Sequence, residues 1–305
     1  MQTILITGGA GFIGSAVSRR LLELGYDVII YDYRTDLQSI SDIEDDIQLV
    51  TADIRDLESL RRAIPSVDGV IHLAAVSRVV WGYENPKECV DTNVGGTVNV
   101  LEAARMAVRK PWVVFGSSRE VYGEPVELPV VESAPKLIKN IYGATKIAGE
   151  NLCEQYHANY GTRVGVLRFS NVYGGRYDQL DRVIPKFIRR AKANLDLFIQ
   201  GGRQVFDFTH ISDTVAAIVK LIETIGVTDS YFDDFHVLTG KPTSLVDLSE
   251  LILSRIETTS QIRYVEGRPY DVEKFYGDPS KAAERLSFEA EVDITEGVEA
   301  TIPLL

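Results

Sequence analysis

The sequence predicts a doubly wound (Rossmann) α/β fold, in which helices cover both faces of a parallel sheet, followed by a smaller C-terminal substrate-binding lobe. Short runs rich in β-branched residues alternate with stretches of helical spacing through the first half of the chain. These runs are apolar on both faces, as expected of strands buried between two helical layers. A glycine-rich turn joins the first run to the first helix, an arrangement typical of this class.

Each element follows from its local pattern. Strands are expected at residues 3–7, 28–31, 47–50, 70–73, 112–115 and 163–169. Helices are expected over 87–108 and 142–160. In the first of these helices, Val90, Val94, Val98, Leu101 and Val108 keep to one apolar face.

The regular alternation ends near residue 171. Turn signals at 174–175, 201–202, 240–242 and 267–269 separate shorter elements from there on. We therefore expect a dinucleotide-binding domain over 1–170 and a substrate lobe over 171–305, with some later segments returning to the sheet. Because no Pro/Ser-rich linker separates them, the two parts are expected to pack around one cleft.

Composition limits the possible partners. The chain has 305 residues, 45% of them hydrophobic, and a formal net charge of −12. This charge argues against nucleic-acid and anionic-membrane partners, so an anionic substrate would need a local arginine pocket. No apolar run approaches the roughly 20 residues of a membrane span and no basic leader is present, which predicts a cytoplasmic protein. Cys89 and Cys153 lack metal-ligand spacing, so no metal site is expected.

The glycine-rich turn has glycines at Gly8, Gly11 and Gly14. Gly8 permits a tight turn, Gly11 lets a pyrophosphate approach the backbone, and Gly14 lets the helix pack closely on the strand. The helix that starts at Phe12 and Ile13 offers its N–H groups to phosphate. A flexible turn without a ligand is the alternative, but its place between strand and helix favours a dinucleotide cofactor.

An acid at the end of the second strand predicts which dinucleotide binds. Asp32 is placed to accept hydrogen bonds from the adenosine ribose, and its charge would repel the extra phosphate of NADP. NAD is therefore expected, although Arg34 lies close by. Asp53, followed by Ile54, either caps the adenine pocket or caps the next helix.

Tyr142 and Lys146 are four residues apart and so share one face of a helix. A nearby cation lowers the pKa of a tyrosine from its usual value of about 10, and the phenolate can then take a proton from a sugar hydroxyl while hydride leaves the same carbon for nicotinamide. Ser118, at the carboxyl end of an earlier strand, could position that hydroxyl or serve only as a turn cap.

These motifs resemble the extended short-chain dehydrogenase/reductase family, in its nucleotide-sugar epimerase/dehydratase branch, and are most similar to the UDP-glucose 4-epimerase-like members. The resemblance runs through residues 7–14, Asp32, Asp53, 72–75, 92–97, 117–118, 121–123, 142–146, 168–174, 267–269 and Asp278. It implies an NAD cofactor bound by Leu73, Ala74, Ala75 and Ser117 in a pocket that Asn93 supports, with helix packing as an alternative role for Asn93. It also implies a sugar oxidised at C4 and a homodimer formed through the helices that carry Asn93 and Tyr142. His72 is expected to be a core histidine.

The residues after Ser118 bear on the step that follows oxidation. Dehydratases of the family carry an Asp-Glu pair where this chain has Arg119 and Glu120. A nucleotide-sugar 4-epimerase acting on a UDP-hexose or UDP-hexuronate is therefore the favoured interpretation. Glu120 keeps a UDP-glucuronate decarboxylase open, and Arg119 could meet a sugar carboxylate. Another dehydratase or reductase, or a non-catalytic NAD-binding protein, is less favoured.

The resemblance also implies how the nucleotide is held. Asn171 and Arg268 match positions directed at the diphosphate, and Asp271 lies near the ribose. The family usually has arginine where this chain has Phe206. Either Arg203 supplies the missing cation, although side chains alternate along a strand and it would face the opposite side from residue 206, or the diphosphate is held by one fewer cation.

Overall fold

A parallel sheet of seven strands forms the centre of the larger lobe. The computed structural model describes residues 2–34 and 36–305, and its strands run in the order β10-β6-β5-β4-β1-β2-β3. Their bounds are β1 Thr3–Thr7, β2 Asp27–Asp32, β3 Gln48–Thr51, β4 Gly69–His72, β5 Trp112–Ser118, β6 Val164–Phe169 and β10 Phe232–Val237. Because all pairs are parallel, the strands end at one edge.

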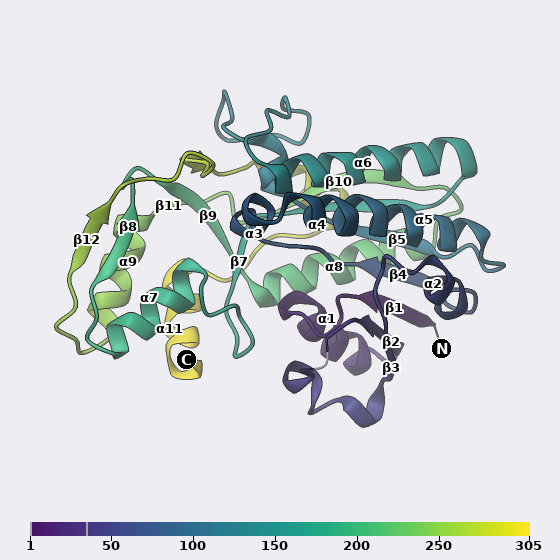
Figure 1. The fold of residues 1–305 in the computed structure, drawn as a ribbon, viewed down its shortest axis with the longest axis horizontal. Helices are drawn as coiled ribbons and strands as arrows, with labels where there is room; N and C mark the ends of the chain where they lie inside the picture. The colour runs from purple at the N-terminus through teal and green to yellow at the C-terminus, as the bar shows by residue number, and fades with distance from the viewer. Residues whose placement is uncertain (1, 35) are drawn as a thin grey trace.

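Two helical layers cover this sheet, as the sequence predicts (Figure 1). One layer consists of α1 Phe12–Glu23, α8 Ile211–Gly226 and α10 Ser280–Leu286. The other consists of α2 Leu57–Ala63, α5 Gly96–Met106 and α6 Ile141–Tyr160. The two layers bury separate clusters of apolar side chains against opposite faces, which explains why the strands read as continuous apolar runs.

The helix expected over 87–108 is present but divided. It runs as α4 Pro86–Val90, a π-helical turn η3 Asp91–Gly95, and α5. The expected apolar face is only partly correct: Leu101 is buried, but Val90 is 44% exposed, and Val108 lies beyond the helix and is 92% exposed. The buried face holds small and polar residues such as Asn93 and Thr97, which an apolar pattern does not reveal.

The chain returns to the sheet after residue 171. Helix α8 and the edge strand β10 belong to the larger lobe (Figure 1). Strand β10 was not expected from its sequence because its second and third residues are Asp233 and Asp234. These acids are balanced by ion pairs with Arg168, Lys281 and Arg285.

The smaller lobe is built on two short sheets. One contains β7 Asn171–Tyr173, β9 Val205–His210, β11 Pro242–Ser244 and β13 Lys274–Phe275, and the other pairs β8 Leu197–Gln200 with β12 Ile262–Val265. Helices α7 Val183–Lys192, α9 Leu245–Arg255 and α11 Ile294–Thr301 complete its core. The remaining helical segments are α3 Val79–Glu84 and the 3-10 turns η1 Gln38–Ile40, η2 Glu44–Asp46, η4 Arg119–Tyr122 and η5 Ile302–Leu304. None of the described helices combines the length and apolar character needed to span a membrane.

Candidate active site

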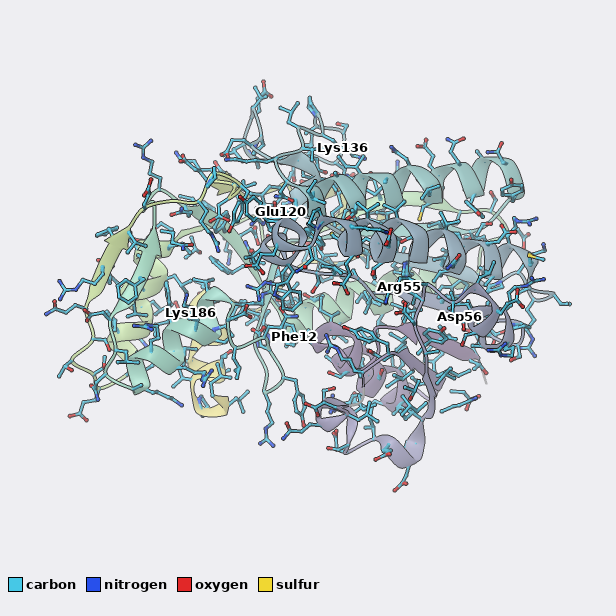
Figure 2. All side chains as sticks on the ribbon, in the orientation of Figure 1. Phe12, Arg55, Asp56, Glu120, Lys136 and Lys186 are labelled. Carbon is cyan, nitrogen blue, oxygen red and sulfur yellow. The ribbon has the colours of Figure 1, made fainter. Side chains whose placement is uncertain are left out.

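A cleft of about 720 Å³ lies where the carboxyl edge of the large sheet meets the smaller lobe. All the site residues predicted from the sequence line it, except Asn93 and Arg203. Figure 2 labels four lining residues: Phe12 at the start of α1, Arg55 in the loop before α2, Glu120 in η4, and Lys186 in α7. The part of the chain that the structure describes contains no cluster of potential metal ligands.

The glycine turn is shaped for close approach of a ligand to the backbone. Gly8 has a φ of 71°, in the left-handed region that favours glycine. A Cβ on Gly14 would lie 2.2 Å from the carbonyl oxygen of Gly8, so no larger residue fits there. Helix α1 begins at Phe12, directly after the turn, and directs its free N–H groups into the cleft. This cradle fits a dinucleotide phosphate.

Asp32 ends β2 and is buried in the cleft wall. Its carboxylate accepts the N–H of Ala10 at 3.0 Å and that of Arg34 at 3.1 Å. The Arg34 guanidinium donates to the carbonyl of Ala10 at 3.3 Å and also lines the cleft. Asp32 is thus held against the glycine turn, as an acid that meets an adenosine ribose must be.

Asp53 also lines the cleft but forms an ion pair with Arg55. Both its carboxylate oxygens accept from Arg55, at 2.6 to 3.0 Å, and this hydrogen bonding lowers the pKa of Asp53. Asp53 does not cap the following helix, because Asp56 does so by accepting the N–H of Ser59 at 3.1 Å. The helix-cap alternative for Asp53 is therefore wrong.

Asn93 lies behind the cleft wall. Its amide accepts the N–H of Val76 at 2.8 Å and donates to the carbonyl of Val76 at 3.1 Å and to the Thr145 hydroxyl at 2.9 Å. It ties the lining loop after β4 to α6, so it supports the cleft from behind, as the resemblance implies, without lining the cofactor space. His72 bonds to Thr7 and Thr97, and burial lowers its pKa to about 3, so it is a neutral core histidine as expected.

The reacting groups come from β5 and α6. Ser118 is the last residue of β5 and faces the cleft, where its hydroxyl also accepts the N–H of Glu120 at 3.2 Å. Helix α6 is capped by Asn140, and one turn apart it presents Tyr142 and Lys146. Lys146 Nζ donates to the carbonyl of Gly116 at 2.7 Å and lies 5.8 Å from the centre of the Tyr142 ring.

The electrostatics of Tyr142 differ from the expectation. Burial raises its pKa above the ordinary value of 10, and the charge of Glu120 adds to this, whereas the nearby Ser118 hydroxyl and the charge of Arg182 oppose it. Burial also lowers the pKa of Lys146 to about 8. Arg182, more than Lys146, is the protein cation that favours the phenolate.

Arg182 was not predicted from the sequence. It precedes α7 at the N-cap position, lines the cleft, and forms no ion pair within residues 2–34 and 36–305. Arg78 lines the same wall but is paired with Asp181. No spacing in the sequence marks either arginine, because their positions depend on loops between elements.

Glu120 and its neighbour form a buried pair. A guanidinium nitrogen of Arg119 lies 3.0 Å from one carboxylate oxygen of Glu120, and the other oxygen accepts from Asn140 at 2.7 Å. Glu120 therefore contacts the cap of the helix that carries Tyr142.

The smaller lobe supplies the far end of the cleft. Arg268 pairs with Asp271 at 2.8 Å, and Asn171 donates to the carbonyl of Asp207 at 3.2 Å. Arg203 is exposed and does not line the cleft, because it lies in the turn before β9, next to Gly202. The following residue, Gln204, lines the cleft instead, with a buried side-chain oxygen that has no partner among the described residues.

The comparisons with known proteins agree with this geometry. Residues 4–231 match the model of the NAD dependent epimerase/dehydratase family. A putative UDP-glucose 4-epimerase of Methanocaldococcus jannaschii is 36% identical over 303 residues, which cover 98% of this chain and 97% of the relative. A UDP-N-acetyl-alpha-D-glucosaminuronate decarboxylase of Bacillus cytotoxicus is 34% identical over 79% of this chain and 82% of the relative.

Solved structures are similar over nearly the full length. The UDP-glucose 4-epimerase of Thermotoga maritima, crystallised with UDP-glucose, has a TM-score of 0.91 at 29% identity and covers 99% of this chain and 98% of its own. The UDP-glucuronic acid 4-epimerase of Bacillus cereus, crystallised with UDP-glucuronic acid and NAD, has a TM-score of 0.92 at 26% identity, with 99% and 98% covered. The cleft, its glycine turn and these similarities lead to one conclusion: the chain is an enzyme of the NAD dependent epimerase/dehydratase family.

Proposed function

We propose that the protein is a nucleotide-sugar 4-epimerase that acts on a UDP-hexose or UDP-hexuronate through a 4-keto intermediate. The observation that carries this proposal is the convergence of Ser118, Tyr142 and Lys146 on one wall of the cleft that the glycine turn opens. The homologous UDP-glucose 4-epimerase of Thermotoga maritima supports the same reaction class.

The roles of the residues follow from their positions. Tyr142 takes the proton of the sugar C4 hydroxyl, and Ser118 holds that hydroxyl beside the phenol. Bound NAD supplies the hydride acceptor. Lys146, fixed by the carbonyl of Gly116, holds a positive charge behind Tyr142, and Arg182 favours the phenolate from the other side. After the sugar turns in the cleft, the hydride would return from the cofactor to the opposite face of C4, while Tyr142 returns the proton to the C4 oxygen.

A UDP-glucuronate decarboxylase is the second candidate, and Glu120 is the observation that favours it. Its carboxylate lies in the cleft wall, and its negative charge raises the pKa of Tyr142. Arg182, which lines the cleft and forms no ion pair among the described residues, would also suit a uronate carboxylate. The relatives with decarboxylase names are consistent with this alternative.

One assay separates the two candidates. The purified protein is incubated with NAD and either UDP-glucose or UDP-glucuronate, and the products are separated and checked for the C4 epimer, UDP-pentose and CO2. We expect the epimer as the main product. UDP-pentose and CO2 without any epimer would overturn the proposal in favour of the decarboxylase.

We also propose a homodimer formed through α5 and α6. These helices lie side by side on the outer face of the larger lobe (Figure 1) and leave Met106 and Tyr160 exposed. Sedimentation at micromolar concentration tests this, and a monomer would contradict it.

A further inference from the structure

Arg119 is a buried cation whose hydrogen-bonding capacity is only partly used. The residue is 9% exposed, and one terminal nitrogen of its guanidinium pairs with Glu120 at 3.0 Å. The other terminal nitrogen, Nη1, is buried and has no hydrogen-bond partner in the part of the chain that the structure describes. Because leaving a buried charged donor unpaired is costly, its retention in a cleft wall indicates a ligand atom.

The side chain is held in place by two aromatic rings. Its guanidinium carbon lies 4.5 Å from the centre of the Phe206 ring and 5.6 Å from that of Phe275. These two residues are direct neighbours on β9 and β13. A guanidinium stacked on rings keeps its edge free for planar hydrogen bonding, so the arrangement presents Nη1 with little freedom to turn away.

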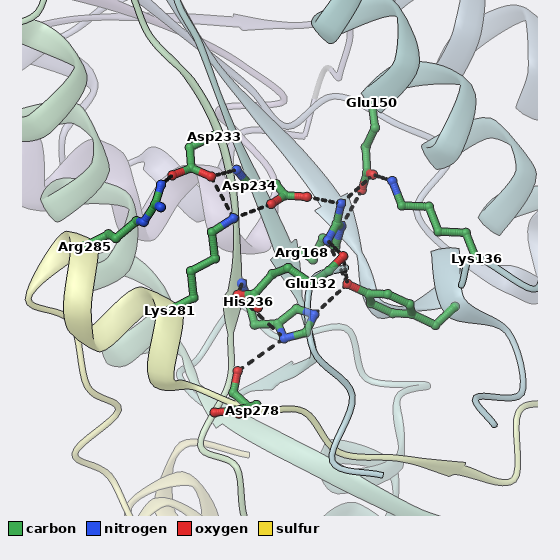
Figure 3. Close-up of polar contacts among 11 residues, drawn as sticks. Glu132, Lys136, Glu150, Arg168, Asp233, Asp234, His236, Asp278, Lys281 and Arg285 are labelled. Atoms are coloured by element: carbon green, nitrogen blue, oxygen red, sulfur yellow. Dashed lines mark hydrogen bonds and ion pairs between the residues drawn. The ribbon is translucent and has the colours of Figure 1, made fainter. Parts of the chain in front are cut away.

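The η4 turn that carries Arg119 is also held by hydrogen bonds to the large sheet. The Tyr122 hydroxyl, one turn along η4, accepts a hydrogen bond from Arg168 at 2.7 Å and forms another with His236 at 2.7 Å. Figure 3 labels these two partners. The η4 turn is thereby fixed to β6 and β10 of the large sheet. Arg119 thus connects a rigid part of the larger lobe to the aromatic surface of the smaller one.

The other cleft arginines that form ion pairs have different surroundings. Arg55, Arg78 and Arg268 pair with carboxylates at the rim, where their side chains are more exposed than that of Arg119. Arg119 instead lies between the Tyr142 end and the Arg268 end of the cleft, since it follows Ser118 in sequence and reaches β9 of the smaller lobe. In a nucleotide-sugar whose sugar lies at Tyr142 and whose diphosphate reaches Arg268, the diphosphate is the segment that leaves the sugar toward the smaller lobe, where the Arg119 guanidinium lies on β9.

We propose that Arg119, stacked on Phe206, binds the diphosphate of the substrate. The inference rests on the proposed function only for the direction in which the substrate lies. Guanidinium is suited to this because its fork matches phosphate oxygens, and Glu120 occupies only one of its edges. It also supplies, within the cleft, a local cation that a chain of net charge −12 needs in order to bind an anion.

Binding of UDP and dTDP to the NAD-loaded protein, measured by titration calorimetry, tests the proposal without requiring turnover. Arg119→Gln is expected to weaken binding of UDP, UDP-glucose and UDP-glucuronate alike, by about 10- to 100-fold. Arg109→Gln, an exposed arginine outside the cleft, is the matched control and should leave binding unchanged. Because UDP itself is measured, a protein that binds UDP through Arg119 but forms no epimer contradicts the proposed function and not this inference.

A reciprocal exchange makes the test specific. Since Arg119 and Phe206 touch, Phe206→Arg in the Arg119→Gln background places a guanidinium beside the vacated space. The double variant is expected to bind UDP more tightly than Arg119→Gln alone, with an affinity of at least about a tenth of the wild-type value. Arg119→Lys, which keeps the charge but not the fork, should lie between wild type and Arg119→Gln, and it replaces the latter if that variant does not fold.

Three results would overturn the proposal. The first is unchanged UDP affinity in Arg119→Gln, or no binding of either diphosphate to the wild type. The second is a loss confined to UDP-glucuronate, which would assign Arg119 to a sugar carboxylate. The third is the absence of any recovery in the double variant.

Discussion

Replacing Glu150 with glutamine tests the buried charge network beneath the active site. Glu150 lies in α6 one turn after Lys146 and accepts two hydrogen bonds from Arg168 at 2.9 Å and one from Lys136 at 2.6 Å (Figure 3). It also accepts one from the Ser117 hydroxyl at 2.6 Å. All four are charge-assisted because the acceptor is a carboxylate, and three of them join opposite charges. Glu150→Gln keeps the shape but removes the charge, and it turns an NH2 donor toward donors that already point at the site.

The expected loss follows from burial. Breaking one side of a buried ion pair costs about 3–5 kcal/mol, and Arg168 keeps Asp234 as a second partner, so the lower half of that range is expected at pH 7. With a urea m-value of about 2–3 kcal/mol per molar, the unfolding midpoint should fall by about 1–2 M.

The effect should depend on pH in a defined direction. Burial raises the pKa of Glu150, but hydrogen bonds and charge from Arg168 and Lys136 outweigh this and hold the pKa below its ordinary value of 4.5. A group whose pKa is lowered on folding stabilises the protein above its unfolded pKa and loses that contribution as pH falls through the folded value. The deficit of Glu150→Gln should therefore be constant from pH 8 to about 5.5 and shrink below about 4.5.

The matched control is Glu154→Gln, an exposed residue one turn further along α6. Urea unfolding followed by fluorescence and circular dichroism gives both free energies. If the two variants differed by less than about 1 kcal/mol at pH 7, or if the deficit persisted at acid pH, the reasoning about the network would be refuted.

Further predictions concern the cleft. Tyr142→Phe should lower kcat for epimer formation by at least about 100-fold while NAD affinity stays within about threefold, and a smaller loss of turnover would remove Tyr142 as the base. Gly14→Ala, whose Cβ would meet a backbone oxygen at 2.2 Å, should weaken NAD binding at least about tenfold in a fluorescence titration, whereas Gly95→Ala, with open space around it, should not. Asp32→Ser should raise the ratio of NADP to NAD affinity by at least about tenfold, because a like charge is removed from the ribose site; an unchanged ratio would contradict that role. Arg182→Met should shift the rising limb of the kcat–pH profile to higher pH, because the Arg182 charge lowers the pKa of Tyr142; a shift to lower pH would reverse the assignment.

Much of the larger lobe could be predicted because its signals are local. Strands buried on both faces leave continuous apolar runs, and a glycine with no room for a Cβ leaves a fixed spacing, as at Gly14. Strand β10 left no such signal, since Asp233 and Asp234 are stabilised by partners from distant segments. Local periodicity carries no information about such partners.

The smaller lobe was less predictable because its side chains are placed by loops. Arg182 takes its position from the segment between β7 and α7, which has no periodic pattern. The departure at Phe206 could be seen in the sequence as a missing cation, but not the guanidinium of Arg119 that lies on its ring, because the two residues are far apart in the chain. Asn93 was recognised, yet its position behind the wall required the path of the loop that it holds.

The π-helical turn at Asp91–Gly95 has a consequence for how this helix can change in evolution. A π turn closes hydrogen bonds over one residue more than an α turn, so the segment carries one extra residue between two stretches that each pack correctly. Gly95 has no atoms within 4 Å of an added Cβ. A deletion at this exposed position would let the turn become α-helical while α4 and α5 keep their present places. The helix can therefore lose one residue without changing which of its side chains contact the sheet.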